Sequence, residues 1–137
     1  MAHDVLLYSA DGAVGRLVLN RPEKRNALNA ELINALKQAL LEAENDAALR
    51  VIVLSGSGKD FCSGADLAAL QKIAAASVAE NHNDARVLLE LFVTIRRLKI
   101  PVVAAVRGRA LAGGCGLATA CDVVLASHTA RFGYPEV

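Results

Sequence analysis

Two glycine-containing segments are the first feature of the sequence that could support chemistry. One is GSGKDFCSGADL at residues 56–67, and the other is GRALAGGCGL at residues 108–117. Each follows a short apolar stretch typical of a buried strand and precedes a segment that we expect to begin a helix. A helix start exposes backbone N–H groups with partial positive charge, and glycine lets a ligand approach that backbone closely. Two such turns could direct two N–H groups at one oxygen atom, which is an oxyanion hole.

The same glycines also suit a purely structural role, because they would let helices pack closely against strands. The spacing alone leaves both interpretations open. Other catalytic or nucleotide-binding motifs fit poorly. Thr119 replaces the last glycine of a dinucleotide fingerprint, and Asp60 follows Gly58-Lys59 where a P-loop needs Ser or Thr. Phe61 replaces the first glycine of a nucleophile elbow around Ser63.

The histidines and cysteines of the chain show no catalytic or metal-binding spacing. The three histidines are scattered along the chain, and we interpret them as solvated or structural (His3, His82 and His128). The three cysteines form no CxxC pair, which favours a reducing compartment (Cys62, Cys115 and Cys121). Two of them, Cys115 and Cys121, are interpreted as small packed apolar side chains.

Segments typical of strands and helices alternate along the chain. Asp11-Gly12 is a favoured hairpin turn, Asn29 is suited to cap a helix, and Pro101 separates a helix from the next strand. Strands are expected at residues 5–8, 16–20, 51–54, 102–106 and 123–126, and helices over 32–43, from about 66, and over 87–98. This order predicts one α/β domain over residues 1–137, with parallel strands covered by helices.

The composition is that of an ordinary globular protein, with 54% hydrophobic and 21% charged residues. The net charge of +1 gives no electrostatic signal for nucleic-acid binding. No uninterrupted apolar run reaches the roughly 18 residues that indicate a membrane span, and the first residues lack the layout of a signal peptide. We therefore expect a cytoplasmic protein without nucleic-acid or membrane partners.

Four ordered motifs together resemble the enoyl-CoA hydratase/isomerase (crotonase) family. They are LNRPEKRNALN at 19–29, DFCSGADL at 60–67, AGGCGLATACD at 112–122 and RFGYPE at 131–136. The resemblance implies a spiral of ββα units that binds acyl-CoA thioesters as substrates, without a metal or other cofactor. It also implies that two backbone N–H groups stabilise the thioester enolate.

Carried over by position, the resemblance assigns the two oxyanion donors to the amides of Ser63 and Gly113. It assigns the contacts with CoA to Lys24, Arg25, Ala27, Ser63, Gly64, Ala65, Asp66 and Gly113. Family hydratases carry a glutamate where this chain has Gly116, whereas their second glutamate corresponds to Glu136.

The missing glutamate bears on the reaction. Hydration needs water activated at one carbon and a proton delivered at the next, and two carboxylates can divide these tasks. A double-bond shift needs only one base. The sequence therefore favours isomerisation with Glu136 as the base. A second acid that would support hydration could come from Glu80, Asp84 or Glu90, although a solvated helix face is the favoured interpretation of these three.

Family members are roughly twice as long as this chain, so we expect a truncated form that lacks the C-terminal helices. The missing part would normally close the acyl pocket and support a homotrimer or hexamer. Three hypotheses stay open: an acyl-CoA enzyme of enolate chemistry, a catalytically silent acyl-CoA-binding member, and an unrelated nucleotide-binding α/β module.

Overall fold

The structure is a computed structural model that describes residues 4–137, so His3 lies outside the described residues. The strands are β1 (Leu6–Asp11), β2 (Val14–Leu19), β3 (Val51–Gly56), β4 (Val102–Val106), β5 (Arg109–Leu111), β6 (Val123–Ala126) and β7 (Arg131–Gly133). The helices are the short 3-10 helix η1 (Pro22–Lys24), α1 (Ala30–Glu44), α2 (Leu67–Ala75), α3 (Val78–Arg97) and α4 (Gly113–Ala120).

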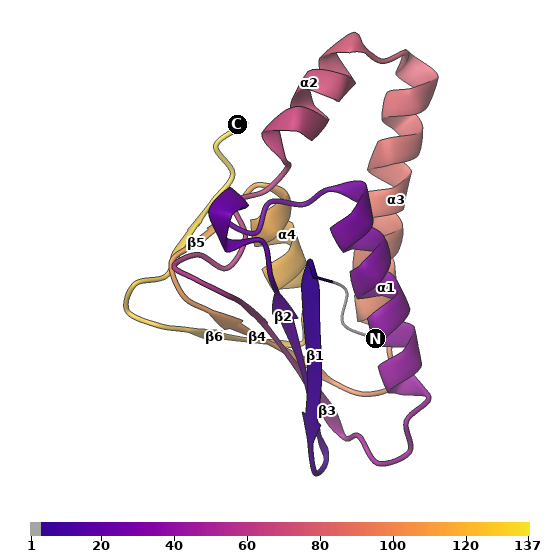
Figure 1. Ribbon diagram of the computed structural model, residues 1–137, viewed down its shortest axis with the longest axis vertical. Coiled ribbons are helices and arrows are strands. Elements are labelled where there is room, and N and C mark those ends of the chain that lie inside the picture. Colours follow the sequence, from indigo (N-terminus) through magenta and orange to yellow (C-terminus); the bar gives the residue numbers. More distant parts are fainter. Residues whose placement is uncertain (1–3) are drawn as a thin grey trace.

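A five-stranded sheet in the order β1-β2-β3-β4-β6 forms the main layer. Its first pair is the predicted antiparallel hairpin, closed by Gly12 at a φ of +57°, and the remaining neighbours are parallel. The three central strands, β2, β3 and β4, alternate buried and less buried residues, and their buried face shares one core with the leucines of α1. Helices α1 and α3 pack beside one another on that side of the sheet (Figure 1).

A second, smaller layer of short extended segments continues from the strands of the main sheet. Segment 62–65 follows β3, β5 follows β4, and β7 follows β6. Cys62 bridges Ala110 of β5, Leu28 bridges Ala65, and β5 pairs with β7 in parallel. Each turn of the chain thus adds one strand to the main sheet and one short segment to the second layer, which gives the predicted ββα spiral.

Local sequence signals account for the starts of the helices. The Asn29 side chain accepts a hydrogen bond from the Leu32 amide at 2.9 Å and caps α1, as predicted. Asp66 caps α2 in the same way through the Ala68 amide. Ser77 and Glu80 form a reciprocal capping box at the start of α3. Helix α3 therefore begins at Val78, well before the region expected from the apolar repeat.

The second glycine segment differs from the prediction in one respect. It was expected to be a single turn between a strand and a helix, but residues 109–111 form β5 before α4 begins at Gly113. A three-residue strand shows no alternation that a sequence pattern could reveal, and β7 was missed for the same reason. The strands at 102–106 and 123–126 have the predicted bounds.

The other face of the main sheet remains open in the described residues. One cross-strand row on this face contains Val53, Val103 and Val123. Nearby, Leu125 is 61% exposed and Leu7 is 40% exposed. The helices of residues 4–137 cover the opposite face, so this apolar face lies against solvent.

Candidate active site

The two glycine segments meet in the second layer of the structure. The Cys62 amide donates to the Arg109 carbonyl at 3.0 Å, and the Leu111 amide donates to the Cys62 carbonyl at 3.0 Å. Gly64 adopts a φ of +100°, and a Cβ placed there would lie 3.7 Å from the Gly113 nitrogen. The fold therefore brings residues 62–64 of the first segment against β5 and the start of α4.

Adjacent glycines in α4 have different roles. A Cβ at Gly114 would lie 2.2 Å from the Cys62 carbonyl oxygen, so this glycine is required for close packing of the helix. A Cβ at Gly113 would meet Leu28 at 3.4 Å and Leu88 at 3.7 Å, which are ordinary contacts. The packing interpretation accounts for Gly114, whereas at Gly113 it does not account for the absence of a side chain.

The backbone around Gly113 is held in a strained conformation. Gly113 is the first residue of α4, so its N–H has no partner within the helix. Ala112 precedes it with a φ of 51° and a ψ of −123°, a region that residues with a Cβ rarely adopt. The Ala112 amide donates to the Gly133 carbonyl at 2.9 Å and helps to fix this turn.

The amide of Ser63, the other predicted donor, has an acceptor within the protein. It donates to the Arg25 carbonyl at 3.1 Å, where Arg25 lies in the left-handed region with a φ of 52°. A ligand oxygen at Ser63 must therefore share this N–H with Arg25 or take it over.

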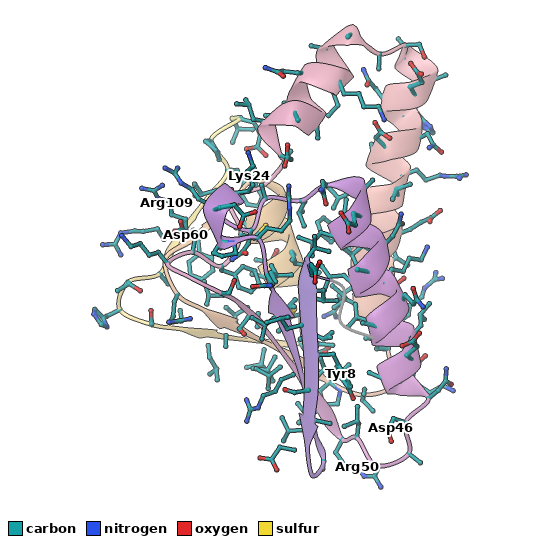
Figure 2. All side chains as sticks on the ribbon, in the orientation of Figure 1. Tyr8, Lys24, Asp46, Arg50, Asp60 and Arg109 are labelled. Carbon is teal, nitrogen blue, oxygen red and sulfur yellow. The ribbon has the colours of Figure 1, made fainter. Side chains whose placement is uncertain are left out.

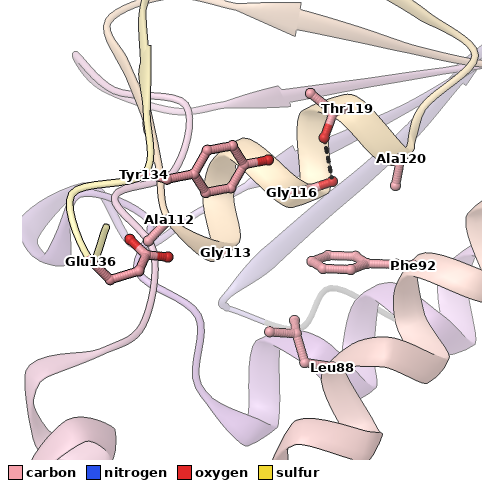
Figure 3. Close-up of a pocket in the computed structure, with 9 residues that line it drawn as sticks. All are labelled: Leu88, Phe92, Ala112, Gly113, Gly116, Thr119, Ala120, Tyr134 and Glu136. Carbon is pink, nitrogen blue, oxygen red and sulfur yellow. Dashed lines mark hydrogen bonds between the residues drawn. The ribbon is translucent and has the colours of Figure 1, made fainter.

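A hollow of about 540 Å³ opens beside the start of α4, and we call it the α4 pocket. Helix α3 contributes Leu88 and Phe92 to one wall, and the C-terminal segment contributes Tyr134 and Glu136 to the other (Figure 3). The remaining lining residues belong to α4 or its N-cap: Ala112, Gly113, Gly116, Thr119 and Ala120. The pocket thus combines the free N–H end of α4 with apolar walls and one carboxylate.

Glu136 is the only acidic side chain that lines the α4 pocket within residues 4–137. The other acids considered from the sequence lie elsewhere. Glu80 accepts a hydrogen bond from the Ser77 amide, which lowers the pKa of Glu80. Glu90 pairs with Lys37 at 2.9 Å on the side of α3 that faces α1, and this contact lowers the pKa of Glu90. Asp84 is exposed on α3 and does not line the pocket.

A polar network under the first glycine segment was missed by the sequence analysis. Arg21 donates to the Asp66 carboxylate at 2.8 Å and also to the Ala27 carbonyl, and the side chains of Arg21 and Asp66 are 12% and 11% exposed. The hydrogen bond from Arg21 lowers the pKa of the Asp66 carboxyl group. This pair joins the loop at 21–27 to the start of α2, so Asp66 has a structural partner besides its predicted contact with CoA.

Asn26 completes this network as a fully buried amide. Its Nδ2 donates to the carbonyls of Ser57 and Asp60 at 2.9 Å each, and its Oδ1 accepts from the Arg21 amide at 2.8 Å. A sequence signal for Asn26 did exist, since it lies within the RNALN part of the first motif, but a buried polar residue cannot be recognised from one sequence.

The other residues predicted to contact CoA lie around this network. Lys24 and Arg25 have exposed side chains, Ala27 is buried, and Ala65 is exposed next to Gly64. Figure 2 shows Lys24, Asp60 and Arg109 on the left at about mid-height, away from Asp46 and Arg50 at the lower end. The Asp60 carboxylate accepts from the Arg109 amide at 2.9 Å, which fastens the first segment to β5. The contacts of these residues with CoA stay a prediction.

The cysteines and histidines lie outside the α4 pocket. All three cysteines are buried, and burial raises the pKa of the Cys62 thiol to about 11 and that of Cys121 to about 12. His82 and His128 are exposed. In residues 4–137, no group of three or more His, Cys, Asp or Glu side chains is placed to hold a metal ion. No helix in this part of the chain is long and apolar enough to cross a membrane.

Comparisons with known proteins agree with this architecture. The family model described as enoyl-CoA hydratase/isomerase matches residues 9–137. A Thermus thermophilus protein that is provisionally named an enoyl-CoA hydratase is 45% identical over 126 residues, or 92% of this chain and 50% of its own. The 2,3-dehydroadipyl-CoA hydratase of Escherichia coli is 41% identical over 132 residues, or 96% of this chain and 50% of its own.

Among solved structures, an enoyl-CoA hydratase/isomerase from Xanthobacter autotrophicus Py2 superimposes with a TM-score of 0.94 at 37% identity. The match covers 98% of this chain and 50% of that chain. The chain therefore belongs to the enoyl-CoA hydratase/isomerase family and has the crotonase fold. It spans about half the length of the curated relatives that it matches.

Family membership rules out one of the three hypotheses, the unrelated nucleotide-binding module. The other two, an active enzyme and a silent acyl-CoA-binding member, differ only in turnover. The names of both curated relatives state hydratase, and the isomerisation expected from Gly116 stays a prediction.

Proposed function

We propose that the protein acts on acyl-CoA thioesters and stabilises the enolate form of the thioester with the backbone N–H groups of Ser63 and Gly113. The observation that carries this proposal is the α4 pocket, where an N–H at a helix start and the Glu136 carboxylate line one apolar hollow. A thioester oxygen that becomes negative would accept from these amides. Each such donor typically contributes about 2.7–4 kcal/mol to transition-state stabilisation.

The reaction that suits one carboxylate is the shift of a double bond. In a 3-enoyl-CoA, Glu136 would remove a proton from carbon 2, and the electron pair would delocalise over the dienolate, with its charge on the thioester oxygen. Glu136 would then return the proton to carbon 4, which leaves the double bond between carbons 2 and 3. The atoms balance without water or a second acid, and Gly116 supplies no competing group.

Hydration of a 2-enoyl-CoA is the second candidate reaction. It is favoured by the names of the relatives, which state hydratase. Hydration needs a water molecule activated at carbon 3 and a proton delivered to carbon 2, so a second proton carrier would have to join Glu136. The residues lining the α4 pocket include one other ionisable group, the Tyr134 phenol.

The binding of CoA is proposed for the exposed loop that carries Lys24 and Arg25, together with the backbone of segment 63–66. Two cationic side chains suit the phosphate groups of CoA. Assembly into a homotrimer or hexamer, as expected from the family, is part of the same proposal.

The test compares two substrates with the complete natural protein. We expect 3-enoyl-CoA to be converted to 2-enoyl-CoA faster than water is added to 2-enoyl-CoA. Glu136→Gln should lower the double-bond shift by about 10²–10⁴-fold, the usual contribution of a general base. Ser63→Ala is the matched control, because it keeps the amide and should keep most activity. Brisk hydration that survives Glu136→Gln would overturn the one-base mechanism. Saturable acyl-CoA binding without turnover of either substrate would identify a silent member.

A further inference from the structure

The ring of Phe92 lies where a side chain at position 116 would have to go. A Cβ built on Gly116 would lie 3.0 Å from both Cε2 and Cζ of Phe92, which is closer than nearly all real Cβ contacts. Figure 3 shows the ring next to Gly116 and on the opposite side of the α4 pocket from Glu136.

The position of this ring is fixed by the helix that carries it. Phe92 belongs to α3, where its neighbours Leu91 and Ile95 are fully buried, and the ring itself packs against the core. Helix α3 also contacts α4 directly. A side chain at 116 would therefore have to move the ring by a few tenths of an ångström, against the packing between two helices.

The ring also determines the chemical character of this wall. With Leu88, it presents an apolar surface to the pocket opposite Glu136. A carboxylate at 116 would be pressed against this surface, where no cationic side chain lines the pocket within residues 4–137. Burying a charge beside apolar groups without a partner is unfavourable.

We propose that Phe92 is a specificity-determining residue, which excludes a second acid at position 116 and so restricts the pocket to one-base chemistry on apolar acyl chains. This inference rests on the proposed function, and it adds the reason why the missing glutamate cannot simply be restored. The acyl chain would lie between Phe92 and Glu136, in contact with the ring.

The contact is tested first by stability, without any assay of activity. Gly116 lies inside α4, where Gly→Ala normally stabilises a helix. We expect Gly116→Ala to lower the midpoint of urea unfolding when Phe92 is present and to raise it in a Phe92→Leu background. Gly113→Ala is the matched control, since no Phe92 atom is among its nearest contacts, and its effect should be equal in both backgrounds. Equal effects of Gly116→Ala in the two backgrounds would overturn the proposal.

The reaction is then tested on the complete natural protein with both enoyl-CoA substrates. Gly116→Glu alone should not raise hydration of 2-enoyl-CoA above the parent rate, whereas Phe92→Ala/Gly116→Glu should raise it at least about tenfold, as expected for an added acid–base group. A gain with Gly116→Glu alone, or no gain in a folded double variant, would overturn the proposal. If the parent protein acts on neither substrate, the proposed function fails. The urea unfolding of Gly116→Ala in the two backgrounds still decides whether Phe92 excludes side chains at 116.

Discussion

Within the GGCG motif at residues 113–116, close packing explains some of the glycines but not Gly113. In GGCG, a Cβ at Gly114 would lie 2.2 Å from the Cys62 carbonyl oxygen, so glycine is required there, and a Cβ at Gly116 would lie 3.0 Å from the ring of Phe92. Gly113 has room for a methyl group, so the packing requirement does not extend to it. The residue just before it, Ala112, has a φ of 51° and a ψ of −123°, and this strained conformation sets the direction of the backbone at the start of α4.

At Ala112, we expect a substitution by glycine to raise stability and to lower turnover. Ala112→Gly should increase the free energy of unfolding by about 1–3 kcal/mol, because glycine relieves the strain of the positive φ. It should also lower kcat, because the Gly113 N–H is then less firmly directed. Urea unfolding and steady-state kinetics on the same preparation check both effects. Stability that is unchanged or lower would show that Ala112 is not strained.

The ion pair between Arg21 and Asp66 should make stability depend on pH. The folded pKa of Asp66 lies below its ordinary value of 3.8, so the pair stabilises the fold fully above that pH. Its contribution is lost as the pH falls from 3.8 towards the lowered folded pKa. Asp66→Asn should therefore cost about 1–3 kcal/mol at pH 7 and progressively less as the acid range is entered.

The measurement is urea unfolding of both proteins across pH 3–7, with the free energies compared at each pH. Asp84→Asn on the exposed side of α3 serves as the control and should change stability little at any pH. If the loss in the free energy of unfolding caused by Asp66→Asn is the same at every pH, the folded protein does not favour the charged form of the Asp66 carboxylate.

At the scale of elements, those with a long sequence pattern were predicted better than those with a short one. Helix α1 and strands β4 and β6 were predicted well, because several turns of helix or a complete apolar run separate signal from chance. Strands β5 and β7 were not, because three residues carry no period. The start of α3 was missed although SVAE at 77–80 has the spacing of a capping box.

The candidate site was predicted in outline for a related reason. Gly113 and Glu136 belong to short contiguous motifs that resemble those of the family, and both line the α4 pocket, while their roles stay a prediction. Phe92 and Leu88 reach the α4 pocket from a helix that is distant in sequence, and Asn26 acquires its role only through contacts across the loop. Such residues are defined by the packing of separate elements, which one sequence does not encode visibly.

Among the helices, α2 should be the least protected. It has no buried residue, whereas α1 buries five, and its Leu67 is 72% exposed. Few buried contacts mean that local opening needs little free energy. Hydrogen–deuterium exchange should show the amides of α2 exchanging far faster than those of α1, which is the internal control. Equal protection of both helices would mean that α2 is held by contacts absent from the described structure.

At the scale of the whole molecule, one face of the sheet has no covering layer within residues 4–137. A contiguous apolar surface of this kind usually marks an interaction or leads to association. The 137-residue chain should therefore bind a hydrophobic dye such as ANS and associate as its concentration rises. Leu125→Lys, on the open face, should reduce both effects, whereas Leu41→Lys on the exposed side of α1 should change them less. A monodisperse monomer that binds no dye would contradict this prediction.

The hydrogen bond from the Ser63 amide to the Arg25 carbonyl has a consequence for cooperativity. The Ser63 N–H has two possible acceptors. One is the Arg25 carbonyl, which holds the loop at 21–27, and the other would be a thioester oxygen. Occupancy of the oxygen site would then alter the loop, and a nucleotide held by the loop would alter the oxygen site by the same factor, since coupling between two sites is reciprocal. The acyl and nucleotide ends of a bound CoA thioester would thus influence one another's affinity through a single backbone proton.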